Sequence, residues 1–579
     1  MTAPGTTVID AAAADVLSRA MDRHCAGDPA AAVFYYRQAL ALCPAVAPIH
    51  HALGIVLLAT GRFDDAITAA RRAIILVRDL GPAYDTLAHA LRGAGQGRDA
   101  LRPYRQAITL GVMFPETYGG LGTALFEAEA FGPAALAYRR AMRLDPEQAL
   151  AAFNLGNAWQ ALEQIGRALR AYRHAIALQP DYHEAWSNLG SALKALGRVD
   201  EAIAAYRRGL VVRPDSRRLH VNMALALLQR GDFQAGWAHY EWRWRGAAFR
   251  AWRPASSAPD WDGGPLAGRT LLLFCEQGFG DALQFVRFAP LAAARGGRVL
   301  LRTDPALAGL LARVSGIDQV IPYGAPLPSF DVQLPLLSLP RLFGTDLDSI
   351  PAAVPYLSAD PAAVAVWRQR LAAIPGLKVG LVWAGDPRRF DRDTARVDRQ
   401  RSLRLDDFAG LAQIPGITLV SLQKGDAAGQ AATPQAGLAL IDWTAALGNF
   451  ADTASLVAAL DLVITVDTAV AHLAGGLGKA VWILSRFDGC WRWLRHRDDS
   501  PWYPTARLFR QQRPGDWVTV LGRVRQALAA FPRQDGRDAT TANVVPGAGP
   551  GAELSGEGSA SDENRAIPLI GAVAAGSDD

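Results

Sequence analysis

The chain of 579 residues is about three to four times the length of a common domain, and half of its residues are hydrophobic. The net charge of +5 is too small over this length to indicate a nucleic-acid-binding protein. The four cysteines are widely spaced and form no C-x-x-C pair, which argues against a disulfide scaffold or a zinc ribbon and favours a reducing compartment. Because we find neither a secretory signal nor a run of about 18 uncharged apolar residues, we expect a cytoplasmic protein without a membrane span.

Residues of the same type recur every 34 positions through the first half of the chain. The alanines are Ala66, Ala100, Ala134, Ala168 and Ala202, the tyrosines Tyr104, Tyr138, Tyr172 and Tyr206, and the leucines Leu53, Leu87, Leu121, Leu155 and Leu189. Gly54, Gly122, Gly156 and Gly190 follow four of these leucines, and Pro146, Pro180 and Pro214 share the period. A small residue lets two helices approach closely and a proline ends the second helix, so the pattern predicts a stack of helix pairs.

This pattern resembles the tetratricopeptide repeat, with about six units over residues 13–216 and a degenerate last unit over 217–243, where Gly236 replaces the expected alanine. We predict a repeat solenoid over residues 10–245. The resemblance implies a concave surface that binds an extended peptide or another protein. A rigid spacer or a dimerisation surface is the alternative.

The second half of the chain alternates short apolar runs with helical stretches. A linker strap over 246–268, rich in Pro, Gly, Ser and Trp, precedes strands predicted at 270–274, 298–302, 319–321, 332–334, 379–383, 418–422, 462–466 and 480–484. Helices are predicted between many of them, such as 282–294 and 454–460. This alternation is typical of parallel sheets, and a break near 360–376 predicts two Rossmann-like halves over 269–365 and 366–533. The tail, 534–579, has eight acidic and two basic residues and is predicted to be disordered.

The first candidate site follows the predicted strand 270–274. The chain continues through Gln277, Gly278 and Gly280 to Asp281, which opens a helix. Glycine permits a tight turn close to a ligand, and a carboxylate at the end of a strand could remove a proton from an attacking hydroxyl group. Capping of the helix is the alternative role for Asp281.

The second candidate site follows the predicted strand 462–466. Asp467 and Thr468 precede a helix that carries His472 one turn later. The free N–H groups at such a helix start suit a diphosphate, to which Thr468 could donate a further hydrogen bond. A capped helix with a hydrogen-bonded core histidine is the alternative.

Further cations lie beyond two other predicted strands. Six arginines occupy 384–403, where paired hydrogen bonds could hold phosphate: Arg388, Arg389, Arg392, Arg396, Arg399 and Arg401. Gln423 and Lys424 follow the strand 418–422. A solvated loop with internal ion pairs is the alternative for most of the arginines. The aromatic block of Trp491, Trp493, Trp502 and Tyr503 could wall a base or acceptor site, or pack against a sheet.

The spacing of these motifs resembles glycosyltransferase family 9, the heptosyltransferase-like enzymes of the GT-B fold, in the variety fused to tetratricopeptide repeats. The resemblance covers roughly 268–530 and the repeats. It implies an inverting transferase without metal or cofactor, with Asp281 as the base, Asp467, Thr468 and His472 at the phosphates, and Arg401 as a basic contact. Ala469 stands where the family has glycine, and the loop 386–400 is longer and richer in Asp and Arg than expected. Asp391-Arg392-Asp393 matches a metal motif by letters, but we assign it no metal because it lies in this arginine-rich loop.

The predicted reaction is direct displacement at the anomeric carbon of a nucleotide sugar. Asp281 would deprotonate the acceptor, while Thr468, Arg401 and Lys424 would hold the diphosphate. Repeats joined to such a domain imply a protein acceptor, for which flagellin or another surface protein is a candidate. The alternatives are a non-catalytic interaction scaffold with a degenerate transferase domain, and a lipopolysaccharide-type heptosyltransferase.

Overall fold

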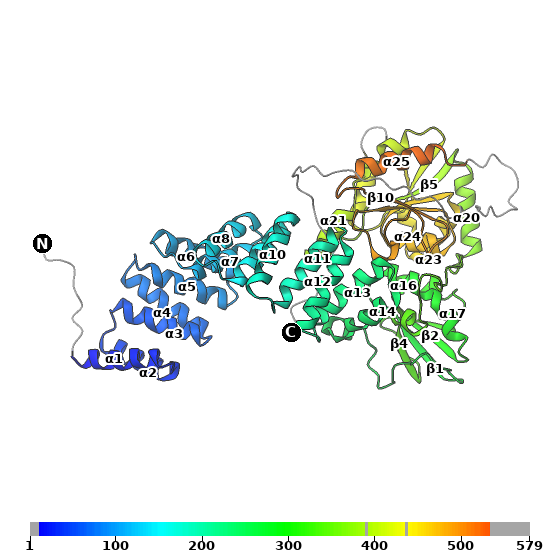
Figure 1. Ribbon diagram of the computed structural model, residues 1–579. Coiled ribbons are helices and arrows are strands. Elements are labelled where there is room, and N and C mark those ends of the chain that lie inside the picture. The colour runs from blue at the N-terminus through cyan, green and yellow to red at the C-terminus, as the bar shows by residue number, and fades with distance from the viewer. Residues whose placement is uncertain (1–10, 388–391, 435–437, 533–579) are drawn as a thin grey trace, which may run out of the picture. The chain divides into compact units, whose positions relative to one another are not determined.

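The computed structural model describes residues 11–387, 392–434 and 438–532 (Figure 1). The predicted disordered tail lies outside the described residues, as do Arg388, Arg389 and Asp391. The chain divides into two compact units between Ala192 and Leu193. Within the described ranges, each helix is too short or too polar to cross a membrane.

Fourteen helices form seven consecutive pairs joined by short turns, as the 34-residue period predicts (Figure 1). The pairs are α1 (Ala11–Cys25) with α2 (Pro29–Leu42), α3 (Ala47–Ala59) with α4 (Phe63–Leu76), α5 (Gly81–Gly93) with α6 (Gly97–Thr109), α7 (Pro115–Glu127) with α8 (Phe131–Leu144), α9 (Ala149–Ala161) with α10 (Ile165–Leu178), α11 (His183–Ala195) with α12 (Val199–Val212), and α13 (Arg217–Arg230) with α14 (Phe233–Tyr240). The division between the units falls inside α11, so the last helices pack with the second unit.

The periodic residues explain the spacing of the paired helices. The five periodic alanines from Ala66 to Ala202 are fully buried, and the four periodic tyrosines are at most 2% exposed. A Cβ atom on Gly122 would lie 2.7 Å from the ring of Tyr138, and one on Gly156 would lie 2.5 Å from the ring of Tyr172. The tyrosine of each second helix therefore occupies the space that the glycine of the first helix leaves open.

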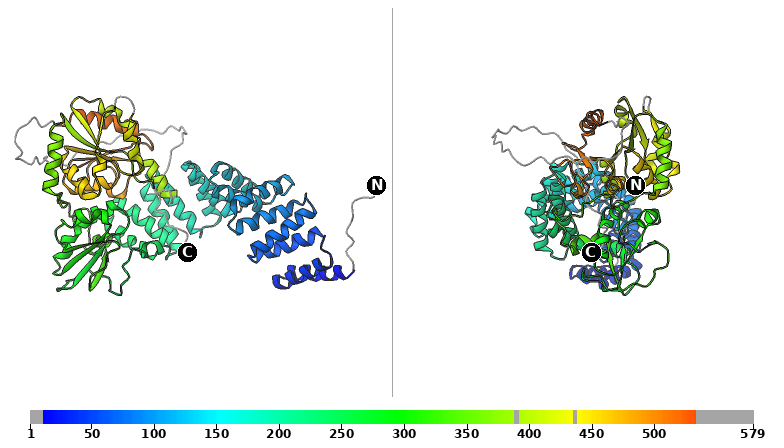
Figure 2. Two further views of the ribbon diagram at one scale, coloured as in Figure 1. Left: turned by 180° about the vertical axis from the view of Figure 1, so that it is seen from behind. Right: turned by 90° about the vertical axis from the view of Figure 1, so that its right-hand side faces the viewer.

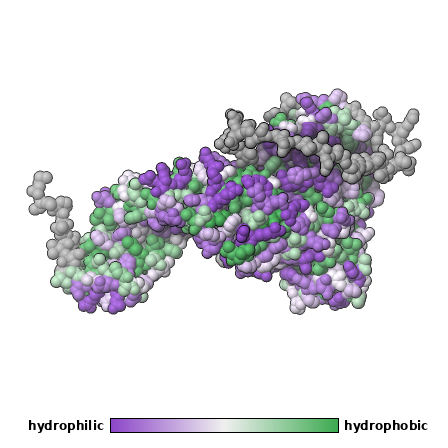
Figure 3. Space-filling model, viewed as in Figure 1, coloured by the Kyte–Doolittle hydropathy of each residue, from purple (hydrophilic) through white to green (hydrophobic). Residues whose placement is uncertain are grey.

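The surface of the repeats mixes polar and apolar side chains, as the visible face in Figure 3 shows. Phe34 and Phe114 are more than half exposed, as are Ile75, Leu136 and Leu150.

The second unit contains two sheets in which all the strands run parallel (Figure 2). The first has the order β3-β2-β1-β4, with β1 (Thr270–Phe274), β2 (Arg298–Thr303), β3 (Gln319–Pro322) and β4 (Val332–Pro335). The second has the order β10-β9-β8-β5-β6-β7, with β5 (Leu377–Val382), β6 (Ile417–Ser421), β7 (Leu440–Asp442), β8 (Leu462–Val466), β9 (Val481–Ser485) and β10 (Ala506–Arg510).

Helices precede, connect and follow these strands. α15 (Ala247–Arg250) precedes β1, and α25 (Trp517–Ala529) follows β10. Between the strands lie α16 (Phe279–Phe285), α17 (Ala289–Ala293), α18 (Pro305–Leu311), α19 (Leu339–Leu342), α20 (Pro361–Ala372), α21 (Arg392–Arg401), α22 (Ala409–Ala412), α23 (Phe450–Ala459) and α24 (Ala469–Gly476). The helix α20 spans the predicted break near 360–376 and leads from the first sheet region into β5.

The eight predicted strands are present, whereas the short edge strand β7 and the arginine-rich β10 were not predicted. The single helix predicted over 282–294 is wrong, because α16 and α17 are separated by a 3₁₀ turn at Val286–Phe288. Pro290 has no N–H group to donate to the carbonyl of Val286, so a continuous α-helix would lose a hydrogen bond there.

The last helix pair shares a hydrophobic core with the first sheet. Phe233 and Trp237 of α14 are at most 2% exposed and belong to the same cluster as Leu271 of β1 and Phe285 of α16. The indole N–H of Trp237 also donates to the carbonyl of Thr345, at 3.0 Å. The end of the repeats is therefore an integral part of the second unit.

Candidate functional site

The sheet orders place both candidate loops where the strand order reverses. In the first sheet, β1 lies between β2 and β4. In the second sheet, β5 lies beside β8, with β6 next to β5 and β9 next to β8. In open parallel sheets, ligands bind at the carboxyl ends of strands at such reversals. Asp281 lies beyond β1, and Asp467 and Thr468 lie directly beyond β8.

Asp281 lies in the first turn of α16, which Gly278 precedes. One carboxylate oxygen, Oδ2, accepts a hydrogen bond from the backbone N–H of Gly278 at 2.9 Å. The other, Oδ1, pairs with the guanidinium of Arg492, and the Asp281 side chain is 17% exposed. Asp281 therefore caps its own helix and also forms an ion pair with Arg492, which lies in the second sheet region.

Arg492 is a functional candidate that the sequence analysis missed. Its Nε donates to Gln284 at 2.6 Å, and its Nη1 to the sulfur of Cys490 at 3.2 Å. Although burial disfavours its charge, the Asp281 carboxylate raises the pKa of Arg492 above its usual value. In the sequence, Arg492 stands between Trp491 and Trp493 of the aromatic block. Its contact with Asp281 is visible only in the tertiary structure.

The backbone before Asp281 is held by the end of the repeats. Gln277 has a φ of +69°, which a non-glycine residue seldom adopts, and its side-chain amide donates to the hydroxyl of Tyr240 at 2.8 Å. The neighbouring Glu276 pairs with Arg243 at 2.8 Å, with both side chains at most 1% exposed. Burial raises the pKa of Glu276 to about 7, although Arg243 opposes the shift.

Thr468 is the N-cap residue of α24, but its side chain makes no capping hydrogen bond to the helix. Its hydroxyl lies 3.0 Å from that of Thr465. The N–H group of Ala471 donates to the Thr468 carbonyl at 3.1 Å, whereas those of Ala469 and Val470 have no side-chain cap and are available to an anion.

His472 is 5% exposed and packs on the ring of Trp493 at 5.2 Å, and its Nδ1 lies 2.9 Å from the hydroxyl of Tyr503. Burial lowers the pKa of His472 well below its usual value, and the charges of Arg492 and Arg287 add to this shift, so the imidazole is neutral. When Tyr503 donates to Nδ1, the ring hydrogen lies on Nε2.

Arg401 lies beside Asp467. Its Nη1 donates to the Asp467 carbonyl at 2.9 Å, while Nη2 pairs with Asp398 at 2.9 Å. Gly385, just beyond β5, makes this possible, since a Cβ atom there would lie 2.2 Å from Nη2 of Arg401. The guanidinium thus links the ends of β5 and β8.

The two candidate loops meet at Gly280. A Cβ atom on Gly280 would lie 2.8 Å from Cδ2 and 3.4 Å from Nε2 of His472, and 3.5 Å from Cα of Ala469. The helices α16 and α24 therefore pack against each other through a glycine (Figure 1). The structure brings together Asp281, Gly280 and His472 from segments almost 200 residues apart.

Lys424 and Gln423 make different contacts. The Lys424 ammonium donates to the carbonyl of Thr444 at 3.0 Å and is exposed. The Gln423 amide accepts hydrogen bonds from the backbone N–H groups of Trp383 and Ala384, at 3.0 and 2.9 Å. Gln423 thus ties the end of β5 to the end of β6, and these contacts do not connect either residue to Asp281.

The aromatic block is packed inside the unit. Trp491, Trp493, Trp502 and Tyr503 are at most 5% exposed. Their role in this structure is the packing that the sequence analysis gave as the alternative.

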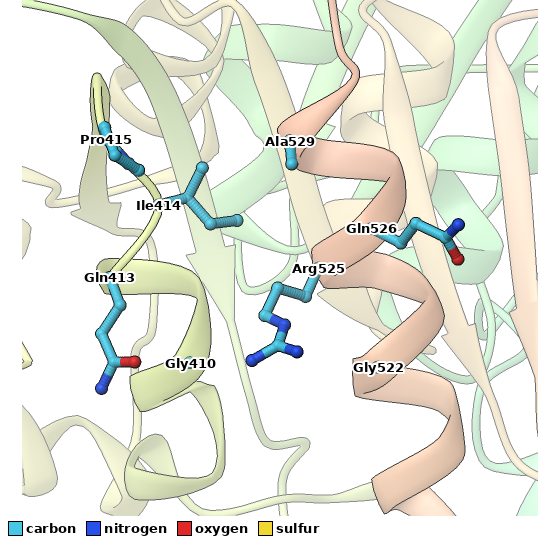
Figure 4. A pocket seen from close by; sticks show the side chains of 8 residues that line it. All are labelled: Gly410, Gln413, Ile414, Pro415, Gly522, Arg525, Gln526 and Ala529. Atoms are coloured by element: carbon cyan, nitrogen blue, oxygen red, sulfur yellow. The ribbon is translucent and has the colours of Figure 1, made fainter.

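A surface groove of about 570 Å³ lies between α22 and α25 (Figure 4). Its lining includes Gln413, Ile414, Arg525 and Gln526, and the candidate residues described above are not part of it. Among the described residues, His, Cys, Asp and Glu side chains form no group that could hold a metal ion.

Comparisons with known proteins identify the repeats. Family models described as tetratricopeptide repeat match residues 26–92, 86–149, 147–216 and 192–241. Protein FlbA of Caulobacter vibrioides (strain ATCC 19089 / CIP 103742 / CB 15) is 30% identical over 333 residues, which cover 53% of this chain and 54% of FlbA. The match thus spans about half the length of that relative.

Two solved structures are also similar. YrrB, described as a TPR protein with an unusual peptide-binding site, is 17% identical with a TM-score of 0.30 and covers 32% of this chain and 95% of its own. MamA is 24% identical with a TM-score of 0.28 and covers 29% of this chain and 92% of its own. With the family models and the observed helix pairs, residues 26–241 are tetratricopeptide repeats, and they are followed by parallel sheets and helices.

Proposed function

We propose that the second unit is an inverting, metal-independent glycosyltransferase of the GT-B type. It transfers a sugar from a nucleotide-sugar donor to a hydroxyl group of a protein acceptor that the repeats recruit, such as flagellin or another surface protein. The contact between α16 and α24 at Gly280 carries this proposal, since it joins a carboxylate beyond β1 to an uncapped helix start beyond β8.

The proposed reaction is one displacement. The Asp281 carboxylate takes the proton of the acceptor hydroxyl, and the hydroxyl oxygen forms a bond to the anomeric carbon. The bond from this carbon to the diphosphate breaks, and the electron pair leaves with the nucleoside diphosphate. The N–H groups at the start of α24 stabilise the negative charge on that leaving group, together with the Arg401 guanidinium.

His472 would assist as a neutral donor. Its imidazole is uncharged in the buried site, and its Nε2 lies at the contact between the two helices. A neutral hydrogen-bond donor stabilises a phosphate oxygen without adding a buried charge.

A non-catalytic scaffold is the second candidate, and the pairing of Asp281 with Arg492 favours it. If the Asp281 carboxylate serves only to hold its helix to the segment of Arg492, the protein needs no acceptor substrate. In that case the repeats would bind a partner, and the second unit would be a rigid extension of them.

Substitution of Asp281 by Asn distinguishes the two candidates. We expect Asp281→Asn to reduce transfer of sugar to surface proteins at least 100-fold, measured by mass spectrometry of those proteins, while leaving nucleoside diphosphate affinity near that of the wild type. Asp304→Asn is the matched control, because Asp304 caps α18 beyond the neighbouring strand β2 and asparagine also caps helices. Unchanged transfer in Asp281→Asn, or no thermal stabilisation of the wild type by ADP, GDP, UDP or CMP, would support the scaffold.

A further inference from the structure

Three cations surround one buried carboxylate at the carboxyl end of β9. Asp488 is 3% exposed, and its Oδ1 accepts a hydrogen bond from Nε of Arg486 at 2.8 Å. Lys194 of α11 and Arg495 also lie within electrostatic reach of this carboxylate. The group therefore holds three positive charges, against the buried carboxylate of Asp488 and the charge of Asp467, which also acts on Arg486.

Two of these cations make no hydrogen bond. Within the described residues, the Lys194 ammonium and the Arg495 guanidinium take part in no hydrogen bond or ion pair, although the Arg495 guanidinium lies 5.5 Å from the centroid of the Phe487 ring. The Nε and Nη1 atoms of Arg495 are also inaccessible to solvent. Buried donors are nearly always hydrogen-bonded in folded proteins, and one without a partner calls for an unseen ion, water or ligand.

The Arg495 guanidinium lies against the turn that follows Lys194. Gly197 forms the turn after α11 with a φ of +74°, and a Cβ atom on it would lie 2.4 Å from Nη2 of Arg495. The guanidinium thus packs on the turn that begins just after Lys194. The amide of Gln229 in α13 donates to the carbonyls of Asp488 and Gly489, at 2.9 and 3.0 Å, which fixes the loop between them.

The loop that carries Arg486 and Asp488 also interacts with residues of the candidate donor site. The charge of Asp467, at the end of β8, acts on Arg486 as well as on Cys490. Cys490 in turn accepts the hydrogen bond from Arg492, the partner of Asp281. The loop from Arg486 to Arg492 therefore connects the unpartnered cations to both candidate loops.

Electrostatics alone would not keep such a group together. Burial lowers the pKa of Lys194 and the charge of Arg486 adds to this shift, while only Asp488 and Cys490 oppose it. Burial also lowers the pKa of Arg495. An anion that entered between them would remove the excess positive charge and satisfy the free donors.

We propose that Lys194 and Arg495 bind a phosphate group of the nucleotide-sugar donor. The guanidinium offers paired hydrogen bonds to phosphate oxygens, and the ammonium offers a compact charge beside it. This inference rests on the proposed transferase function. It assigns a donor-binding residue to the repeat helix α11, so that the repeats complete the donor site in addition to recruiting an acceptor.

Binding of inorganic pyrophosphate and of ADP, GDP, UDP and CMP to the full chain, measured by calorimetry at one ionic strength, tests the inference. Whichever nucleotide binds the wild type, we expect Lys194→Gln and Arg495→Gln each to weaken its binding 10- to 100-fold. Lys378→Gln and Arg497→Gln are the matched controls, since Lys378 lies in β5 and Arg497 already pairs with Asp499 at 2.6 Å. Lys194→Arg keeps the charge and should retain most of the affinity.

The outcomes separate this inference from the proposed function. Nucleotide binding that is equal in the wild type and both glutamine variants would overturn the inference and leave the transferase proposal standing. Binding of pyrophosphate but of no nucleotide, lost in both variants, would keep the anion site and overturn its role in donor binding. No binding of any of these anions to the wild type would overturn both. Lost binding in Lys194→Gln that Lys194→Arg does not restore would indicate a folding defect and would count against the inference.

Discussion

The guanidinium of Arg243, just after the last repeat helix, and the carboxylate of Glu276, just after β1, form an ion pair from which solvent is excluded. Arg243 also donates to Ser338 at 2.9 Å and to Glu241 at 2.9 Å. Glu276 directly precedes Gln277, whose left-handed backbone conformation leads to Asp281. The end of the repeats therefore determines where the Gly-Asp loop lies.

Removing one partner of this pair should be strongly destabilising. Arg243→Met leaves the Glu276 carboxylate buried without its partner, and we expect a loss of about 3–5 kcal/mol in the free energy of unfolding. The double variant Arg243→Met, Glu276→Gln should recover part of this loss, because the uncompensated charge is gone. Urea denaturation measures both effects. Arg253→Met is the control, since Arg253 pairs with Asp260 at a partly exposed site where about 1 kcal/mol or less is at stake.

The contact between α16 and α24 should not tolerate a methyl group. Gly280→Ala places a Cβ atom 2.8 Å from the ring of His472, and we expect a loss of about 1–3 kcal/mol in stability together with weaker nucleotide binding. Gly522→Ala in α25 has no atom within 4 Å and should stabilise the protein by about 0.4–1 kcal/mol. Equal melting temperatures for the two variants would show that the contact at Gly280 is looser than described.

The repeats offer a similar comparison within one helix pair. Gly156→Ala in α9 would bring a methyl group 2.5 Å from the ring of Tyr172, whereas Gly166→Ala in α10 meets nothing within 4 Å. We expect Gly156→Ala to destabilise the repeats by about 1–3 kcal/mol and Gly166→Ala to leave them unchanged or more stable. Thermal denaturation followed by circular dichroism checks this, and a destabilising Gly166→Ala would contradict it.

Two histidines near the last repeat predict a pH dependence of stability. Nδ1 of His220 lies 2.7 Å from Nδ1 of His239, and burial lowers the pKa values of both. Because these histidines bind protons at a lower pKa in the folded chain than in the unfolded chain, where the pKa is near 6.5, stability is complete above that pH and falls as the pH drops below it.

The size of this effect is bounded. Each of the two histidines can lower the free energy of unfolding by at most about 1.4 kcal/mol per pH unit, and the effect of His239 is smaller because it is partly exposed. Urea denaturation at several pH values between 7.5 and 5.5 should show a shallower decline for His239→Gln than for the wild type. His496→Gln, at an exposed position, should follow the wild type, and a decline in His239→Gln as steep as in the wild type would refute the assignment.

The sequence by itself determined the repeats and most of the strands. A 34-residue period in Ala, Tyr, Leu and Gly can be satisfied only when the same pair of helices recurs, because each small residue must face the same large one in every unit. Apolar runs between helical stretches likewise predicted eight parallel strands. The edge strand β7 and the charged β10 carry too weak an apolar pattern to be recognised locally.

Only the tertiary structure decided which distant groups meet. Asp281 and Arg401 were predicted from their local sequence, and a resemblance to a known family added their roles, but no local pattern shows that Arg492 reaches Asp281 or that Glu276 pairs with Arg243. These contacts depend on how helices and sheets pack in the second unit. An ionised group that is removed from water needs a compensating charge or hydrogen bond, so burial makes these contacts important for stability. The packing of the whole unit decides which residue supplies the compensating group.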